Sequence, residues 1–325
     1  MKIFRKGYLK RWWKILMTTF MGFIDDNGLK LSASLAYYTI FSLAPLLVLV
    51  MALIGIFFKE EHNRQLFYDQ LQHFVGLQAS DQIKNIIKNY AMHGKSGAAL
   101  VSGIAILLVG ASSMFVEIQD SLNMIWRVKA KPKKGWLKLL QNRFLSFSLI
   151  ASLGFLLLVS LLVNILITAL SSKIQHFFPG ITILIYVINL AITLVVITVL
   201  FAIIFKVLPD VKISWKDVRS GAIFTALMFM LGQYLIGLYI QYFANSSAYG
   251  AAGSVVVILT WIYYTSAILY IGAEFTQVYA EAIGSRIEPA EYAVAVKQTE
   301  IEMEVKKMPA QNPDIKDNLK DPPIA

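Results

Sequence analysis

The stretch from Ile181 to Phe205, ITILIYVINLAITLVVITVLFAIIF, decides the fold class of this 325-residue chain. Its 25 residues contain no charged side chain. About 20 apolar residues, rising 1.5 Å each, cover the hydrocarbon core of a bilayer. A helix also satisfies its own backbone hydrogen bonds there. The stretch therefore predicts a transmembrane helix.

Five other stretches of the chain have the same character, and 57% of all residues are hydrophobic. They are Ser32–Phe58, Gly97–Ile118, Phe144–Leu170, Gly221–Phe243 and Ala251–Ala273. A water-soluble chain has no reason to carry so many apolar runs of this length. We therefore expect an all-α polytopic membrane bundle of six transmembrane helices, within a domain spanning residues 32–285.

The loops between these stretches alternate between strongly basic and nearly uncharged. Of the 30 lysine and arginine residues, 24 lie before the first span, in the loops 127–143 and 206–219, or after the sixth span. Basic residues near span ends are retained in the cytoplasm. Both termini are therefore expected in the cytoplasm, with segment 59–96 as the large extracytoplasmic piece.

The formal net charge of +10 raises the question of an anionic partner. Because these charges lie at span ends, they fit the anionic lipid headgroups of the cytoplasmic membrane face rather than nucleic acid. The chain has no cysteine, so thiol catalysis and thiolate metal sites are excluded. No cofactor or metal site is expected, and a homo-oligomer is compatible with the sequence.

Residues 1–31 are expected to form a cytoplasmic amphipathic helix at the membrane interface, not a cleaved signal peptide. Aromatic and leucine residues recur there every three or four positions, opposite lysines, and no small-x-small cleavage site follows. The run Asp25-Asp26-Asn27-Gly28 is expected to end this helix.

Two further segments lie outside the predicted spans. Residues 59–96 carry two apolar stripes at helical spacing, which predict two short extracytoplasmic helices that either cap the bundle or gate it. From 286 to 325 the chain becomes charged and proline-rich. This composition predicts a largely disordered cytoplasmic tail.

Acidic residues near the cytoplasmic ends of the second and sixth spans are the main site candidates, because carboxylates close to hydrocarbon need a partner or a wet cavity. Arginines are expected at the same level. The candidate residues are Glu117, Asp120, Asn123, Arg127, Arg143, Arg219, Glu274 and Gln277. They form either an ion-pair belt that fixes helix register or a site for a substrate or proton.

Other local features are weaker indicators. Pro45 lies inside the first span and predicts a kink. Gly221 and other small residues should allow helices to approach closely. The chain lacks a Walker loop, a dinucleotide fingerprint and an His-Glu-x-x-His motif, so nothing in it indicates a soluble enzyme.

Several motifs taken together resemble a known family. They are Ala33-Ser34-Leu35-Ala36-Tyr37-Tyr38-Thr39, Leu122-Asn123-Met124-Ile125-Trp126-Arg127-Val128, Leu208-Pro209 with Trp215 and Asp217, Gly237-Leu238-Tyr239, Tyr249-Gly250, Trp261-Ile262-Tyr263-Tyr264 and Gly272-Ala273-Glu274. In this order, across residues 15–285, they resemble the YihY/BrkB family of bacterial inner-membrane proteins. The resemblance implies a six-span helical protein of the bacterial plasma membrane.

The resemblance leaves the activity open. Members have been labelled ribonucleases, associated with serum resistance, and proposed to move lipids or envelope precursors. A metal-dependent nuclease needs clustered histidines and acids in a wet cleft, and the sequence offers none on the cytoplasmic side. We therefore expect a transporter or flippase-like protein for an anionic lipid or envelope precursor. The alternatives are a non-transporting scaffold for envelope assembly and, third, a membrane-embedded hydrolase.

Overall fold

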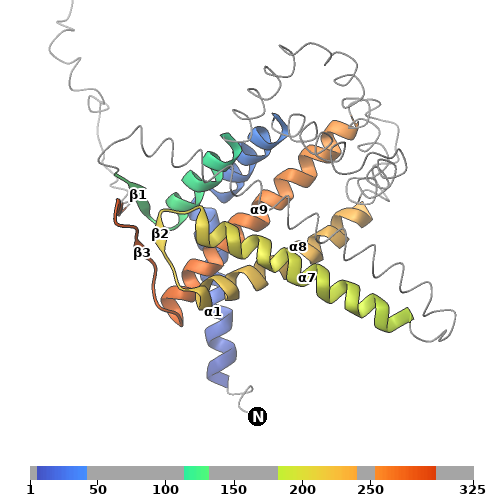
Figure 1. The fold of residues 1–325 in the computed structure, drawn as a ribbon, viewed down its shortest axis with the longest axis horizontal. Helices are drawn as coiled ribbons and strands as arrows, with labels where there is room; N and C mark the ends of the chain where they lie inside the picture. The colour runs from blue at the N-terminus through green and yellow to red at the C-terminus, as the bar shows by residue number, and fades with distance from the viewer. Residues whose placement is uncertain (1–5, 42–112, 132–181, 240–252, 298–325) are drawn as a thin grey trace, which may run out of the picture. The chain divides into compact units, whose positions relative to one another are not determined.

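The computed structural model describes residues 6–41, 113–131, 182–239 and 253–297. These residues form helices joined by short strands (Figure 1). The helices are α1 (Lys6–Asp25), α7 (Thr182–Val207), α8 (Trp215–Tyr239) and α9 (Gly253–Ala282), together with helical residues 28–41 and 113–125. α8 packs against both α7 and α9, and α9 also packs against α1.

Two of the described helices are long and apolar enough to cross a membrane, over Ile183–Val207 and Trp215–Ile236. They coincide with the predicted fourth span and much of the predicted fifth. Residues 253–273 of the sixth predicted span lie within α9, which continues beyond the span to Ala282. The third span, most of the first two and the segment 59–96 lie outside the described residues. The helical character is confirmed, whereas the count of six spans stays a prediction.

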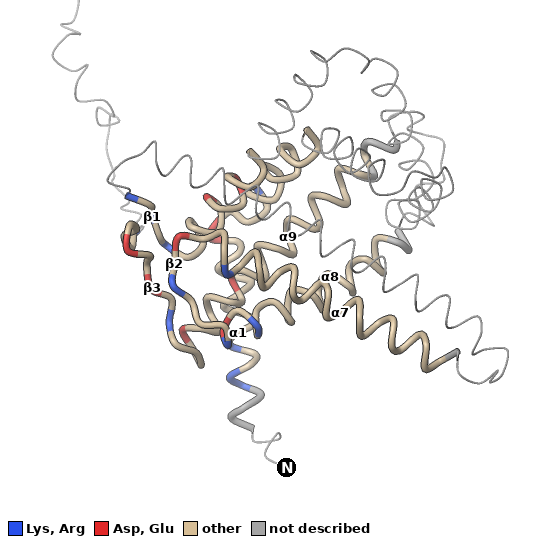
Figure 2. Tube along the Cα trace, viewed as in Figure 1, with Lys and Arg blue, Asp and Glu red and all other residues tan. Residues whose placement is uncertain are grey.

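Much of α7 and α8 presents apolar side chains to the exterior. The large apolar residues that are at least two-fifths exposed are Ile183, Leu184, Tyr186, Val187, Ile188, Leu190 and Val195 on α7, and Trp215, Ile223, Leu227, Leu231, Tyr234 and Leu235 on α8. Water-soluble monomers rarely expose an apolar surface this continuous. Figure 2 shows that the charged residues gather instead around β1, β2 and β3, at one end of these helices. This distribution fits helices that pass from an aqueous boundary into hydrocarbon.

The sequence predicted an all-α protein, but the structure also contains two short antiparallel pairs of β-strands at this charged end. β1 (Val128–Ala130) pairs antiparallel with β4 (Ala293–Ala295), and β2 (Val211–Lys212) pairs antiparallel with β3 (Glu288–Pro289). The residues after α9 therefore join two segments that are about 80 positions apart in the chain. We call the joined residues 126–131, 208–214 and 283–295 the collar. The first ten residues of the expected tail, 286–295, belong to this paired structure.

Helices α8 and α9 approach each other through two matching glycine–threonine pairs. A Cβ atom added to Gly221 would lie 1.8 Å from Thr276 Oγ1, and one added to Gly272 would lie 2.0 Å from Thr225 Oγ1. Each threonine hydroxyl donates to the glycine carbonyl one turn earlier in its own helix, at 2.7 Å for Thr225 and 2.6 Å for Thr276. The close approach predicted at Gly221 is thus confirmed.

The buried core joins the end of helix 113–125 to α7, α8 and α9. Its members include Leu122, Ile125, Trp126, Phe201, Phe205, Val218, Ala222, Ala226, Leu269, Tyr270 and Ala273. The Trp126 Nε1 atom donates a 3.0 Å hydrogen bond to the Ala273 carbonyl oxygen, in the middle of this core. Arg127 directly follows Trp126, and Glu274 directly follows Ala273. The core therefore holds Arg127 and Glu274 at the same height along the helix bundle.

Helix α1 ends where the sequence predicted. Asn27 has a φ of 56°, a left-handed conformation that asparagine tolerates at a helix C-terminus. One face of α1 is buried, with Ile15, Thr19 and Phe23, and the opposite face exposes Trp13 and Met17. The helix is thus packed into the protein on one side and exposes both apolar and basic residues, including Lys10 and Lys14, on the other. Its place at a membrane interface stays a prediction.

Candidate functional site

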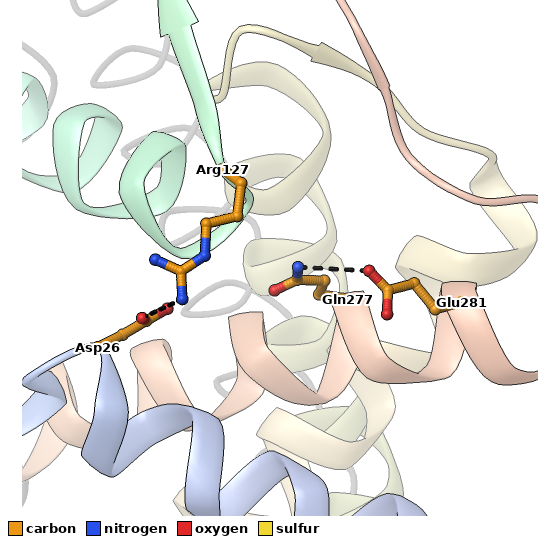
Figure 3. A network of polar contacts seen from close by, with 4 residues as sticks. All are labelled: Asp26, Arg127, Gln277 and Glu281. Atoms are coloured by element: carbon orange, nitrogen blue, oxygen red, sulfur yellow. Dashed lines mark hydrogen bonds and ion pairs between the residues drawn. The ribbon is translucent and has the colours of Figure 1, made fainter. Parts of the chain in front are cut away.

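The turn after α1 and the turn after helix 113–125 meet beside the collar, where an aspartate and an arginine form an ion pair. An Arg127 Nη2 atom lies 2.5 Å from Asp26 Oδ1 (Figure 3). Asp26 is in the turn after α1, and Arg127 follows helix 113–125 with a φ of 55°. Positive φ is uncommon for an arginine. The Asp26 side chain is 5% exposed and the Arg127 side chain 37%, so the pair joins a buried carboxylate to a solvent-accessible guanidinium.

Glu274 lies beside this pair, on α9, one residue beyond the predicted sixth span. It is 3% exposed, and its Oε1 atom has no hydrogen-bond partner among the described residues. A Cβ atom added to Gly22 of α1 would lie 2.7 Å from Glu274 Oε2, so the carboxyl group packs directly on that glycine. Burial raises the pKa of Glu274, and the charge of Asp26 raises it further, while Arg127 opposes both effects.

A second polar contact lies between helix 113–125 and the loop after α7. Gln119 Nε2 and Asn123 Nδ2 donate to the two carboxylate oxygens of Asp210 at 3.2 and 2.9 Å. The Asp210 backbone N–H donates to Asn123 Oδ1 at 2.9 Å. All three side chains are buried. A buried carboxylate that is held by several donors fixes the position of a loop, so this contact fastens the collar to helix 113–125.

Within the described residues, Glu117 and Asp120 make no hydrogen bond or ion pair with Glu274. Glu117 is half-buried, and Asp120 is exposed on helix 113–125. Partial burial raises the pKa of Asp120, and the neighbouring charges of Glu117 and Asp210 raise it further. The contacts of the described residues thus form one cluster around Asp210 and another around Glu274, and the similar depth of the two acidic groups stays a prediction.

The other predicted site residues have simpler surroundings. Gln277 Nε2 lies 3.5 Å from Glu281 Oε1, on the exposed side of α9 (Figure 3). Arg219 is exposed near the start of α8 and makes no ion pair with a residue that the structure describes. Arg143 and Pro45 lie outside the described residues. Within the described ranges, no group of three or more acidic or histidine side chains could hold a metal ion.

Two residues of the site were not among the predicted candidates. The sequence predicts Asp26 only as part of the run that ends α1, and it does not predict Asp210 as a site residue. A signal existed for Asp210, because Gln119 and Asn123 are four residues apart and therefore lie on one helix face, where they need a common acceptor. For Asp26 the sequence holds no such signal, because its partner is about 100 residues away.

Comparison with known proteins agrees with the motifs. Residues 19–295 match the family model described as virulence factor BrkB. A UPF0761 membrane protein of Pseudomonas aeruginosa strain LESB58 is 29% identical over 259 residues, which cover 77% of this chain and 59% of that protein. The corresponding protein of Pseudoalteromonas translucida is 29% identical over 257 residues, covering 78% of this chain and 81% of that protein.

The chain thus spans less than two thirds of the Pseudomonas relative's length and most of the Pseudoalteromonas relative's. No solved structure matches it. The family match covers α9 and all four collar strands, and it includes every described residue of the Asp26, Arg127 and Glu274 cluster. The chain therefore belongs to the BrkB family and is a membrane protein of the UPF0761 type.

Proposed function

We propose that this protein is a transporter or flippase-like protein of the bacterial inner membrane, for an amphiphile with an anionic headgroup. Both termini and the collar would then lie on the cytoplasmic side. Anionic lipids would be its partners, and no enzymatic step or cofactor would be involved. The observation that carries the proposal is the ion pair of Arg127 with Asp26.

Arg127 has the properties required of a headgroup ligand. Its guanidinium is partly exposed, while its carboxylate partner is buried, so an incoming phosphate or carboxylate can reach the arginine without entering the core. Arginine binds such groups through two parallel N–H donors. The exposed apolar faces of α7 and α8 would accommodate acyl chains at the same time. The headgroup would replace Asp26 as the partner of Arg127.

The experiment measures redistribution of a fluorescent phosphatidylglycerol between the leaflets of proteoliposomes that contain the full chain. The wild type should accelerate redistribution. Arg127→Ala should slow it about 10- to 100-fold, since a charge-assisted hydrogen bond contributes about 1.5–3 kcal/mol. Lys212→Ala is the matched control, because Lys212 is also a collar cation but pairs with the exposed Glu291.

Equal rates for Arg127→Ala and wild type, with both proteins folded, would exclude Arg127 as the headgroup ligand. If the wild type itself does not move the lipid, the scaffold interpretation is favoured. That interpretation then requires cross-linking to recover a stoichiometric envelope-assembly partner.

A further inference from the structure

The cluster beside Arg127 carries more negative than positive charge. The negative charges of Asp26 and Asp25 act on the Glu274 carboxyl, and the positive charge of Arg127 opposes them. Arg127 already makes its 2.5 Å contact with Asp26. Among the described residues, one buried oxygen of Glu274 therefore has no hydrogen-bond donor, and Arg127 is shared with Asp26. A buried carboxylate in this state is costly unless a further positive species binds.

The packing around Glu274 restricts which positively charged species can bind to its carboxylate. The carboxyl group lies directly against Gly22, where even one added carbon atom would come within 2.7 Å of Oε2. The described residues supply no third acidic or histidine ligand that would complete a metal site. A proton needs neither space nor a coordination shell. It also turns one carboxylate into a donor for its neighbour.

We propose that Glu274 and Asp26 form a proton-binding site that holds one shared proton, and that binding of this proton is coupled to binding of an anionic headgroup at Arg127. The proton comes from a solvent hydronium ion: one O–H bond of that ion breaks, which leaves a water molecule, and one O–H bond forms on a Glu274 oxygen. The new O–H group donates a hydrogen bond to Asp26. Nothing in the family assignment specifies such a site.

The described elements around Glu274 are consistent with a shared proton. The α1 end contributes Asp25 and Asp26, and the turn after helix 113–125 contributes Arg127. Among the described residues, α8 contacts this part of α9 through Gly221, Phe224 and Thr225, none of which carries an ionisable group. Burial of the Glu274 carboxyl favours its protonated form, and the pKa of Glu274 is raised accordingly.

The link to Arg127 rests on the proposed function. When an anionic headgroup draws Arg127 away from Asp26, the negative charge of Asp26 and Glu274 is no longer offset by the guanidinium. The pair then binds its proton more tightly. Because such coupling is reciprocal, protonation of the pair in turn favours headgroup binding at Arg127.

The proton site is tested without any transport measurement. The full-length protein in lipid nanodiscs is examined by infrared spectroscopy at neutral pH, in H₂O and D₂O. The C=O stretch of a protonated carboxyl should be present in wild type and lost in Glu274→Gln. Glu281→Gln, which changes an exposed carboxyl two turns later on the same helix, should retain the band. Absence of the band in wild type, or its persistence in Glu274→Gln, would overturn the proposal.

A stability measurement covers the case in which Glu274→Gln fails to fold. The pKa of Glu274 is higher in the folded than in the unfolded protein. The folded state therefore binds the proton more tightly, and wild-type stability should fall as the pH rises above the unfolded-state value of 4.5. Glu281→Gln should leave this fall unchanged, and Asp26→Asn should reduce it. A flat profile in wild type contradicts the proton site even if lipid transport is observed.

Discussion

The contact between α8 and α9 and the contacts that close the collar hold helices in place by opposite means. α8 and α9 approach through glycines covered by threonine side chains, whose hydroxyls bond within their own helices. The collar relies on Asp210 and on short strand ladders that join distant segments. The first contact depends on shape and the second on hydrogen-bond partners. Substitutions should therefore destabilise the α8–α9 contact through steric overlap and the collar through the loss of hydrogen-bond partners.

The largest effect is expected where shape alone decides the contact. Gly221→Val should destabilise the protein by about 3 kcal/mol or more, because the added carbons enter the space of the Thr276 side chain. The measurement is the thermal unfolding midpoint of the full-length protein in detergent. Ser220→Val is the control, since the Ser220 hydroxyl is exposed and bonds only to its own helix.

A second substitution distinguishes a steric effect from a loss of helix propensity. Thr276→Ala removes the group that an alanine at position 221 would meet. The double variant Gly221→Ala/Thr276→Ala should therefore lose less stability than the sum of the losses measured for the two single variants. Strict additivity would show that the glycine–threonine contact does not set the helix spacing.

An intermediate effect is expected in the collar. Asp210→Ala should cost about 2 kcal/mol, because it leaves the buried amide donors of Gln119 and Asn123 without their acceptor. Amide hydrogen exchange should increase locally in β2 and β3 and much less at the α8–α9 contact. Asp210→Asn, which keeps one acceptor oxygen, should have a smaller effect. Uniform exchange across both regions would mean that they do not behave as separate units.

The smallest effect is expected at the outer surface of the collar. Lys212 lies 3.0 Å from Glu291, but both side chains are mostly exposed. Exposed ion pairs contribute about 0–1 kcal/mol. Lys212→Ala should therefore change the unfolding free energy by less than about 0.5 kcal/mol, as measured by chemical denaturation. A larger loss would indicate that this pair, and not Asp210 alone, holds β2 against β3.

The same contrast explains what the sequence could predict. Helices α7, α8 and α9 were predicted because long apolar runs have a direct physical meaning, and the end of α1 was predicted because Asp25-Asp26-Asn27-Gly28 disfavours a helix. Gly221 was identified as a packing position for the same kind of local reason. Each of these features depends on neighbours in the chain.

The collar was not predicted, because its strands have two or three residues each and carry no readable alternation. The sequence suggested disorder from residue 286, since the segment is charged and proline-rich. The structure instead uses backbone pairing, which hardly depends on side-chain type. The contact of Asp26 with Arg127 likewise joins residues that are 101 positions apart. Glu274 was predicted as a site residue, but its neighbours could not be.

The strand pairing also has a consequence for the order in which the protein is assembled. β1 and β2 are synthesised long before their partners, which follow α9. During translation, residues 128–130 and 211–212 therefore have no strand to pair with until residues 288–295 have left the ribosome. The two strand pairs of the collar can therefore form only after α9 has been synthesised.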